Sequence, residues 1–168
     1  GVIEILKLMA ADLRVEDQGV AGGEPVARLV AACSDLQGVA VPPELIPLAI
    51  DELPLVFALA ACAKGETLIR GAEELRHKES DRIGIMVANL RALGVEVEEF
   101  EDGARIVGGG LRGGTVDSAG DHRIAMAFSV VAMCAQEPVT ILDAANVATS
   151  FPGFVSLMQS IGLQVDNA

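Results

Sequence analysis

Apolar side chains recur at helical spacing in the middle of the chain and then switch to an alternating pattern. The helical spacing predicts an amphipathic helix over residues 81–93. Alternation over residues 95–98 predicts a strand, residues 101–103 predict a turn, and residues 104–107 predict the returning strand. A helix followed by a β-hairpin is therefore expected here.

The same order of elements is predicted at both ends of the chain. Residues 3–13 follow a helical period and lead into an apolar segment at 13–15 and a polar turn around Gly19. Residues 153–161 are also predicted to be helical, and residues 162–165 follow them in the place of a strand. The chain thus repeats one arrangement of helix and strand.

An apolar helix followed by a short strand occurs twice between these ends. The first copy has its helix at 53–63 and its strand at 66–69, and the second has them at 124–135 and 138–142. A shift of 72 residues superimposes the two copies. The matching pairs are Cys62 with Cys134, Ala63 with Ala135, and Ile69 with Ile141.

These repeats predict an α/β fold with two complete units and a partial one at the start. The glycine-rich segment 108–114 is predicted to be a loop. Because the chain opens inside a repeat, we expect it to be a fragment of a longer protein.

The amino-acid composition restricts the kinds of molecule that the protein is expected to bind. The chain has 168 residues, of which 51% are hydrophobic and 3% aromatic, with no Trp or Tyr. This length corresponds to about one domain, with an aliphatic core. The net charge of −12 argues against nucleic acid or an anionic membrane surface as a partner.

The cysteines and the apolar runs indicate a cytoplasmic protein. Cys33, Cys62 and Cys134 lie in apolar settings without metal-ligand spacing, so we expect reduced core residues and no metal site. The longest uncharged apolar runs have 11 and 12 residues, fewer than the roughly 20 that a spanning helix needs. No signal-peptide pattern opens the chain.

The positively charged residues are concentrated around the residues that are candidates for a binding or catalytic site. Six of the 12 Lys and Arg residues fall within a 28-residue stretch. Lys78, Glu79 and Arg82 stand at the start of the helix predicted over 81–93, with Ser80 or a neighbour available as its cap. An Arg there opposes the helix dipole, but helix-start N–H groups bind anions, which favours a phosphate or carboxylate ligand. The alternative is a solvated, self-neutralising run of charges.

Two further helix starts carry charged residues. His122 and Arg123 follow Asp121 directly before the second apolar helix, and His122 is either structural or a hydrogen-bonding group. Asp51 precedes the first apolar helix and is either an ordinary helix-start acid or a site residue. In the repeat these residues occupy comparable positions, so we expect them to face the same way.

Four motifs stand in order along the chain. They are Asp-Glu-Leu-Pro at 51–54, Lys-Glu-Ser-Asp-Arg at 78–82, Asp-His-Arg-Ile-Ala-Met-Ala at 121–127, and Ala-Thr-Ser-Phe-Pro at 148–152. Together they resemble the C-terminal half of the 5-enolpyruvylshikimate-3-phosphate (EPSP) synthase family. The resemblance covers residues 1–168 and implies that the chain is a single domain of a two-domain enzyme. It also implies that this domain is an inside-out α/β barrel of repeated βαβαββ units.

The resemblance also implies a reaction and roles for five residues. The reaction moves the carboxyvinyl group of phosphoenolpyruvate to the 5-hydroxyl of shikimate 3-phosphate and releases phosphate, without a metal or cofactor. Asp51 corresponds to the base that orients and deprotonates the hydroxyl, and Glu79 to the acid that protonates the phosphoenolpyruvate methylene. Lys78 corresponds to a shikimate-phosphate ligand near the transferred proton. Arg82 and Arg123 correspond to clamps for the phosphoenolpyruvate anion.

The resemblance is incomplete at two points. His122 and Thr149 are expected to contact substrate, but many family members have Lys where this chain has Thr149. The family's N-terminal Lys-Ser, glycine-rich and Ser-Ser-Gln segments are absent, so the N-terminal domain is the missing partner and the chain alone is expected to be inactive. The alternatives are a non-catalytic anion-binding module and a related enolpyruvyl transferase acting on UDP-N-acetylglucosamine.

Overall fold

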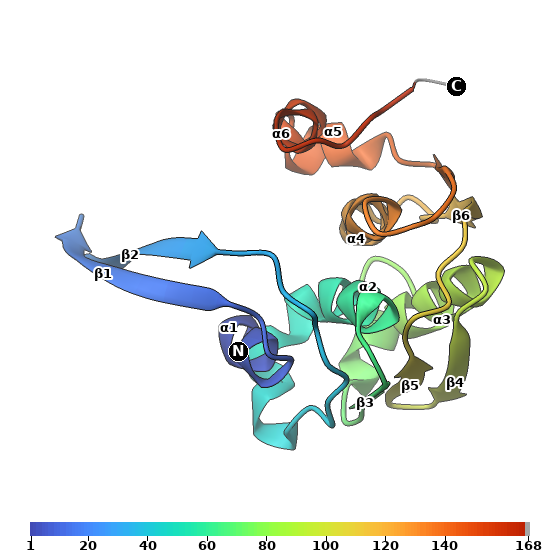
Figure 1. Ribbon diagram of the computed structural model, residues 1–168, viewed down its shortest axis with the longest axis horizontal. Coiled ribbons are helices and arrows are strands. Elements are labelled where there is room, and N and C mark those ends of the chain that lie inside the picture. The colour runs from blue at the N-terminus through green and yellow to red at the C-terminus, as the bar shows by residue number, and fades with distance from the viewer. Residues whose placement is uncertain (167–168) are drawn as a thin grey trace.

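The computed structural model describes residues 1–166 and shows helices and small sheets in an α/β arrangement (Figure 1). The helices are α1 (Val2–Leu8), α2 (Leu53–Cys62), α3 (Arg82–Ala92), α4 (His122–Ala132), α5 (Asn146–Ser150) and α6 (Phe154–Ser160). The strands are β1 (Leu13–Ala21), β2 (Glu24–Ala31), β3 (Glu66–Ile69), β4 (Glu96–Phe100), β5 (Gly103–Val107), β6 (Gly114–Asp117) and β7 (Val139–Leu142). The predicted α/β class is confirmed.

Helices α2, α3 and α4 form the middle of the molecule. Helix α2 packs against both α3 and α4. It is buried over most of its length, and Phe57 on α2 and Phe128 on α4 are both fully buried. The three helices predicted from apolar spacing are confirmed, although α4 begins at His122, two residues earlier than expected.

Strands β3, β5 and β4 form an antiparallel sheet in that order. Val97 of β4 pairs with Ile106 of β5, and both side chains are buried. Glu98 pairs with Arg105 one position further along, and their side chains form an ion pair on the outer face. This alternation confirms the predicted hairpin, because one face of the sheet is apolar and the other polar.

The N-terminal segment differs from the prediction. The helix expected over residues 3–13 ends at Leu8, because the chain turns at Ala10, whose φ of 62° is left-handed. The turn predicted around Gly19 is wrong, since Gly19 lies inside β1 and the chain turns at residues 22–23 instead. The unexpected β2 returns from this turn, and the β1–β2 hairpin projects away from the helices (Figure 1).

The structure confirms the helix predicted near the C-terminus but not the strand predicted after it. Helix α6 lies within the predicted helix 153–161, whereas residues 163–166 have no regular secondary structure. Strand β6 pairs in parallel with β7, and it escaped prediction because it starts at the end of the glycine-rich segment 108–114.

The cysteines are less buried than expected. All three are free, with Cys33 and Cys134 exposed and Cys62 half-buried. The expectation of core positions is wrong for Cys33 and Cys134, because the first follows the end of β2 and the second follows the end of α4. No helix within residues 1–166 is long and apolar enough to cross a membrane.

Candidate functional site

The N-terminal ends of α2, α3 and α4 converge. Arg123 Nη1 donates to the backbone oxygen of Asp51 at 2.8 Å, and Arg82 Nη1 lies 3.5 Å from Asp51 Oδ1. Arg82 Nε donates to Oδ2 of Asp121, the N-cap residue of α4, at 2.8 Å. The expectation that these helix starts face the same way is confirmed. Their free N–H groups and partial positive charges favour an anion at this place.

Arg82 is the first residue of α3, and its side chain is only 1% exposed. The helix is capped by Asp81, which accepts from the Gly84 N–H at 3.0 Å, so the cap is the neighbour of Ser80. A solvated run of charges would leave Arg82 in water, and that interpretation is wrong for this residue. The guanidinium contacts three carboxylates, those of Asp51, Glu79 and Asp121.

Asp121 joins the starts of α3 and α4 from inside the protein. Its fully buried carboxylate accepts from Arg82 Nε, from Ser80 Oγ at 3.0 Å and from the Arg123 N–H at 2.9 Å. Burial by itself raises the pKa of Asp121. The hydrogen bond and charge of Arg82 and the hydroxyl of Ser80 outweigh burial and hold this pKa below its ordinary value. Asp121 is therefore a fixed anion that orients Arg82.

Lys78 and Glu79 lie on the solvent side of Arg82. Lys78 Nζ is 2.5 Å from Glu74 Oε1 and 3.5 Å from Asp51 Oδ1. The hydrogen bond to Glu74 raises the pKa of Lys78, and the charge of Asp51 adds to this against a smaller opposing effect of desolvation. The Glu79 carboxylate pairs with Arg82 Nη2 and is 58% exposed. Glu79 is thus both fixed by a cation and open to a ligand.

Asp51 lies in the 3₁₀ segment η2 (Pro47–Glu52), among three cations. Its carboxylate oxygens are 3.5 Å from Lys78 Nζ, 3.5 Å from Arg82 Nη1 and 3.8 Å from Arg123 Nη2. The N-cap of α2 is Glu52, and no side chain donates or accepts a capping bond there. Asp51 therefore does not cap α2, and its role as a site residue stays a prediction.

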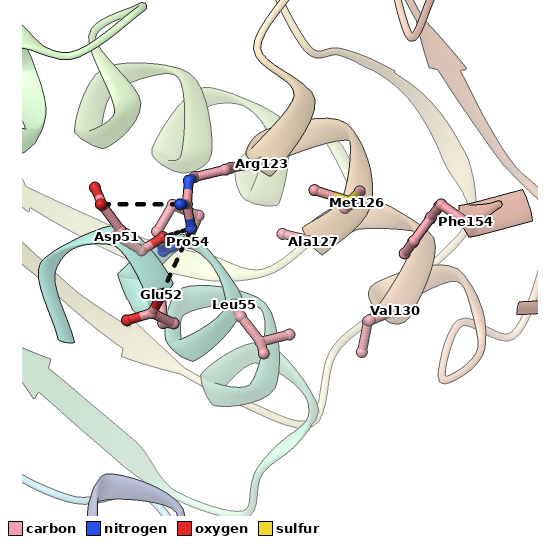
Figure 2. Close-up of a pocket in the computed structure, with 9 residues that line it drawn as sticks. All are labelled: Asp51, Glu52, Pro54, Leu55, Arg123, Met126, Ala127, Val130 and Phe154. Atoms are coloured by element: carbon pink, nitrogen blue, oxygen red, sulfur yellow. Dashed lines mark hydrogen bonds and ion pairs between the residues drawn. The ribbon is translucent and has the colours of Figure 1, made fainter. Parts of the chain in front are cut away.

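A pocket of about 200 Å³ opens beside this cluster between α2 and α4 (Figure 2). Arg123 points from α4 toward Asp51 and Glu52 at its polar end, and the Arg123 side chain is 35% exposed. The remaining lining residues are Pro54, Leu55, Met126, Ala127, Val130 and Phe154. The pocket is therefore charged at one end and apolar along the rest.

Two predicted substrate contacts take no part in the hydrogen bonds and ion pairs of this cluster within residues 1–166. His122 is half-buried in the first turn of α4, and no hydrogen bond joins its side chain to another residue in the range 1–166. Thr149 is exposed on α5 and is not among the residues that line the pocket. Both assignments stay predictions.

Sequence reasoning missed the structural roles of Asp121 and Ser80. Asp81 and Asp121 both precede an Arg at a helix start, so the local pattern does not show which of the two is buried. The helices that follow do not distinguish them either, because both α3 and α4 are largely buried.

Comparisons with known proteins agree with this arrangement. The sequence model of the family described as EPSP synthase (3-phosphoshikimate 1-carboxyvinyltransferase) matches residues 1–158. A 3-phosphoshikimate 1-carboxyvinyltransferase of Acidithiobacillus ferrooxidans is 58% identical over 168 residues, which are 100% of this chain and 39% of that protein. The Alkalilimnicola ehrlichii protein of the same name is 57% identical over 164 residues, 97% of this chain and 37% of that protein.

A solved structure shows the same fold. An EPSP synthase from Acinetobacter baumannii superimposes with a TM-score of 0.95 at 46% identity, covering 98% of this chain and 39% of that chain. The fold and the helix-start cluster define an α/β protein in which Lys78, Arg82 and Arg123 surround the Asp51 carboxylate. The chain belongs to the EPSP synthase family. It spans about 39% of the length of the Acidithiobacillus ferrooxidans relative.

Proposed function

We propose that this chain is the C-terminal part of an EPSP synthase and supplies one wall of the active site. The whole enzyme transfers the carboxyvinyl group of phosphoenolpyruvate to the 5-hydroxyl of shikimate 3-phosphate and releases phosphate. The main observation behind the proposal is the fixed guanidinium of Arg82, which lies with Lys78 and Arg123 around Asp51 where three helices start. Family membership supports the same reaction.

These cations support the proposed binding of two phosphorylated substrates. In the proposal Arg82 and Arg123 bind the phosphate and carboxylate of phosphoenolpyruvate, since a guanidinium fork matches both groups. Lys78 binds the shikimate phosphate, and His122 and Thr149 add polar contacts. The exposed carboxylates now paired with these cations would exchange for substrate anions, whereas buried Asp121 would keep Arg82 in place.

Two carboxyl groups carry the proton transfers in this proposal. Asp51 orients the 5-hydroxyl and takes its proton as the oxygen attacks the enol carbon of phosphoenolpyruvate. Glu79 gives a proton to the methylene carbon, which becomes a methyl group and completes a tetrahedral intermediate. The methyl group then returns a proton to the Glu79 carboxylate as phosphate leaves, which restores the carbon–carbon double bond of the transferred carboxyvinyl group. Each positioned acid or base contributes roughly 10²–10⁴-fold to such a rate.

The proposal includes a domain arrangement. The chain is one domain, built as an inside-out barrel of repeated βαβαββ units, and the opposite wall of the cleft comes from the N-terminal part of the whole enzyme. A site between two walls excludes water on closing and strengthens its ionic contacts. The chain alone is therefore inactive, and its partners are the two substrates and the N-terminal domain. A cytoplasmic location stays a prediction.

A chimeric enzyme tests this proposal. The 168 residues replace the matching segment of the Acidithiobacillus ferrooxidans relative, and phosphate release is measured with each substrate alone and with both. We expect turnover only with both substrates and none from the isolated chain. A folded chimera without turnover, or turnover by the isolated chain, contradicts the proposal.

Substitution in the chimera tests the proposed base. Asp51→Asn is expected to lower kcat by about 10²–10⁴-fold. Asp35→Asn is the matched control, because Asp35 forms only an exposed pair with Lys64, and it should leave kcat unchanged. Full activity of Asp51→Asn would remove Asp51 from this role.

A further inference from the structure

Arg76 lies just before the residues that are proposed to bind shikimate 3-phosphate and to transfer a proton. It belongs to the 3₁₀ segment η3 (Glu73–His77), and Lys78 follows this segment directly. The Arg76 side chain is 22% exposed and makes four hydrogen bonds, two to carboxylates and two to backbone oxygens. No step of the proposed reaction uses it.

Three of these bonds hold the end of the β4–β5 hairpin. Arg76 Nε donates to the Glu101 backbone oxygen at 2.6 Å. Nη2 donates to the Phe100 backbone oxygen at 2.8 Å and to Glu99 Oε1 at 2.9 Å. A guanidinium reaches these acceptors and still directs Nη1 elsewhere, because its five N–H groups form a planar fork. The hairpin is a firm support, since β5 also pairs with β3.

The fourth bond reaches the start of α3. Arg76 Nη1 donates to Asp81 Oδ2 at 2.8 Å, and the other oxygen of that carboxylate accepts from the Gly84 N–H and caps the helix. The Arg76–Asp81 ion pair therefore closes a loop of residues 77–80. This loop carries the proposed shikimate-phosphate ligand and the proposed acid.

The residue at the start of α3 has a separate anchor. Arg82 Nε is held from inside the protein by the Asp121 carboxylate at 2.8 Å. Within residues 1–166, no hydrogen bond or ion pair joins Arg76 to Arg82 or Asp121. Loss of Arg76 should therefore loosen the loop and leave Arg82 in place.

We propose that Arg76 is a positioning residue: it holds the loop 77–80 against the β4–β5 hairpin and so sets where Lys78 and Glu79 meet the substrates. This inference rests on the proposed function. A small displacement of a reacting group, of about 1 Å, can lower a rate by about 10²-fold even when the altered residue is distant.

The chimeric enzyme gives a kinetic test that a merely structural role would not satisfy. Arg76→Gln is expected to lower kcat about 10–100-fold through Glu79. It should raise the KM for shikimate 3-phosphate about tenfold through Lys78, a loss comparable to one hydrogen bond to a charged group. The KM for phosphoenolpyruvate, which depends on Arg82 and Arg123 in the proposal, should stay unchanged.

Arg70→Gln is the matched control at the same hairpin. Arg70 Nε donates to Asp102 Oδ1 at 2.7 Å, and the Arg70 guanidinium carbon lies 4.5 Å from the centre of the Phe100 ring. Within the described residues, Arg70 forms no hydrogen bond or ion pair with the loop 77–80. This variant should leave kcat and both KM values unchanged. Equal changes in the two variants, or unchanged kinetics in Arg76→Gln, overturn the proposal.

Proteolysis of the 168-residue chain tests the loop without catalysis. Lysyl endopeptidase can cut after only three residues of this sequence, Lys7, Lys64 and Lys78. In Arg76→Gln the first cut after Lys78 should be about tenfold faster, because cleavage follows the population of the open form. The cut after Lys64 is the internal reference. Faster cleavage after Lys78 in a chimera that has no turnover contradicts the proposed function and supports the anchoring of the loop.

A milder variant approaches the same ion pair from its other side. Asp81→Asn removes the charge that faces Arg76 but keeps a good N-cap residue, so it tests the loop if Arg76→Gln does not fold. Circular dichroism checks the fold of each chain. We expect the same selective changes in kcat and in the KM for shikimate 3-phosphate, about threefold or more. Unchanged kinetics together with unchanged cleavage after Lys78 overturn the proposal.

Discussion

The starts of α3 and α4 share one local pattern but bury opposite charges. Each has an Asp as N-cap and an Arg in the first turn. At α3 the cap Asp81 is 46% exposed and Arg82 is buried, whereas at α4 the cap Asp121 is buried and Arg123 is 35% exposed. The two buried groups are each other's partner. The comparison shows that a buried charge in this fold depends on a contact between helices and not on the local motif.

The difference also separates a fixed cation from an accessible one. Arg82 is fixed by Asp121 on the inside, so it presents its guanidinium in one orientation. Arg123 is bonded to the Asp51 backbone and has only long contacts, of 3.7 and 3.8 Å, to carboxylates. We therefore expect substitution of Arg82 to lower the free energy of unfolding and substitution of Arg123 to change it little.

The largest effect is expected from Arg82→Ala. This change leaves Asp121 buried without its cation, which costs about 3–5 kcal/mol of unfolding free energy. Urea denaturation of the 168-residue chain measures it. Arg123→Ala is the matched control at the other helix start, and an equal loss in both variants would show that the two Arg residues are not distinguished by burial.

The pH dependence of stability tests the buried partner. Because the folded-state pKa of Asp121 is lowered, its stabilising contribution is complete above the unfolded pKa of about 3.9 and is lost as the pH falls through the folded pKa. Each unit of lowering corresponds to about 1.4 kcal/mol. We expect Asp121→Asn to reduce the difference in unfolding free energy between pH 6 and pH 3. An unchanged difference would mean that other carboxyls account for the acid sensitivity.

A smaller effect is expected from Ser80→Ala. The change removes the hydroxyl that donates to Asp121, and a hydrogen bond to a buried charged group contributes about 1.5–3 kcal/mol. Ser129→Ala is the control, since the Ser129 hydroxyl only bonds back to the Ala125 carbonyl within α4. Equal urea midpoints for both variants would place the Ser80 hydroxyl outside the buried network.

The smallest effect on stability is expected from Arg123→Lys. The partly exposed pairs of Arg123 contribute about 0–1 kcal/mol, and Lys keeps the charge. In the chimera, however, loss of the guanidinium fork should raise the KM for phosphoenolpyruvate with little change in urea midpoint. A destabilised variant with unchanged KM would reverse the contrast between the two helix starts.

The sequence predicts the central helices from their apolar periodicity. It predicts the convergence of Asp51 with Arg123 from the 72-residue repeat, because both signals can be recognised without knowledge of the tertiary packing. It does not predict the burial of Asp121, which depends on the packing of α3 against β6 and α4 against α2. It also misplaces the turn at Gly19, since a glycine at a strand irregularity resembles a glycine in a turn. Thr149 is in a family motif, but only tertiary structure shows that it lies outside the pocket.

The three converging helix starts lie in a chain whose net charge is −12. If the cluster binds an anion as proposed, the ligand meets overall repulsion at long range and attraction only close to Lys78, Arg82 and Arg123. Salt screens the long-range part within about 8–10 Å at physiological ionic strength. Moderate salt should therefore increase the association rate of phosphorylated ligands, in contrast to proteins that steer their ligands by net charge.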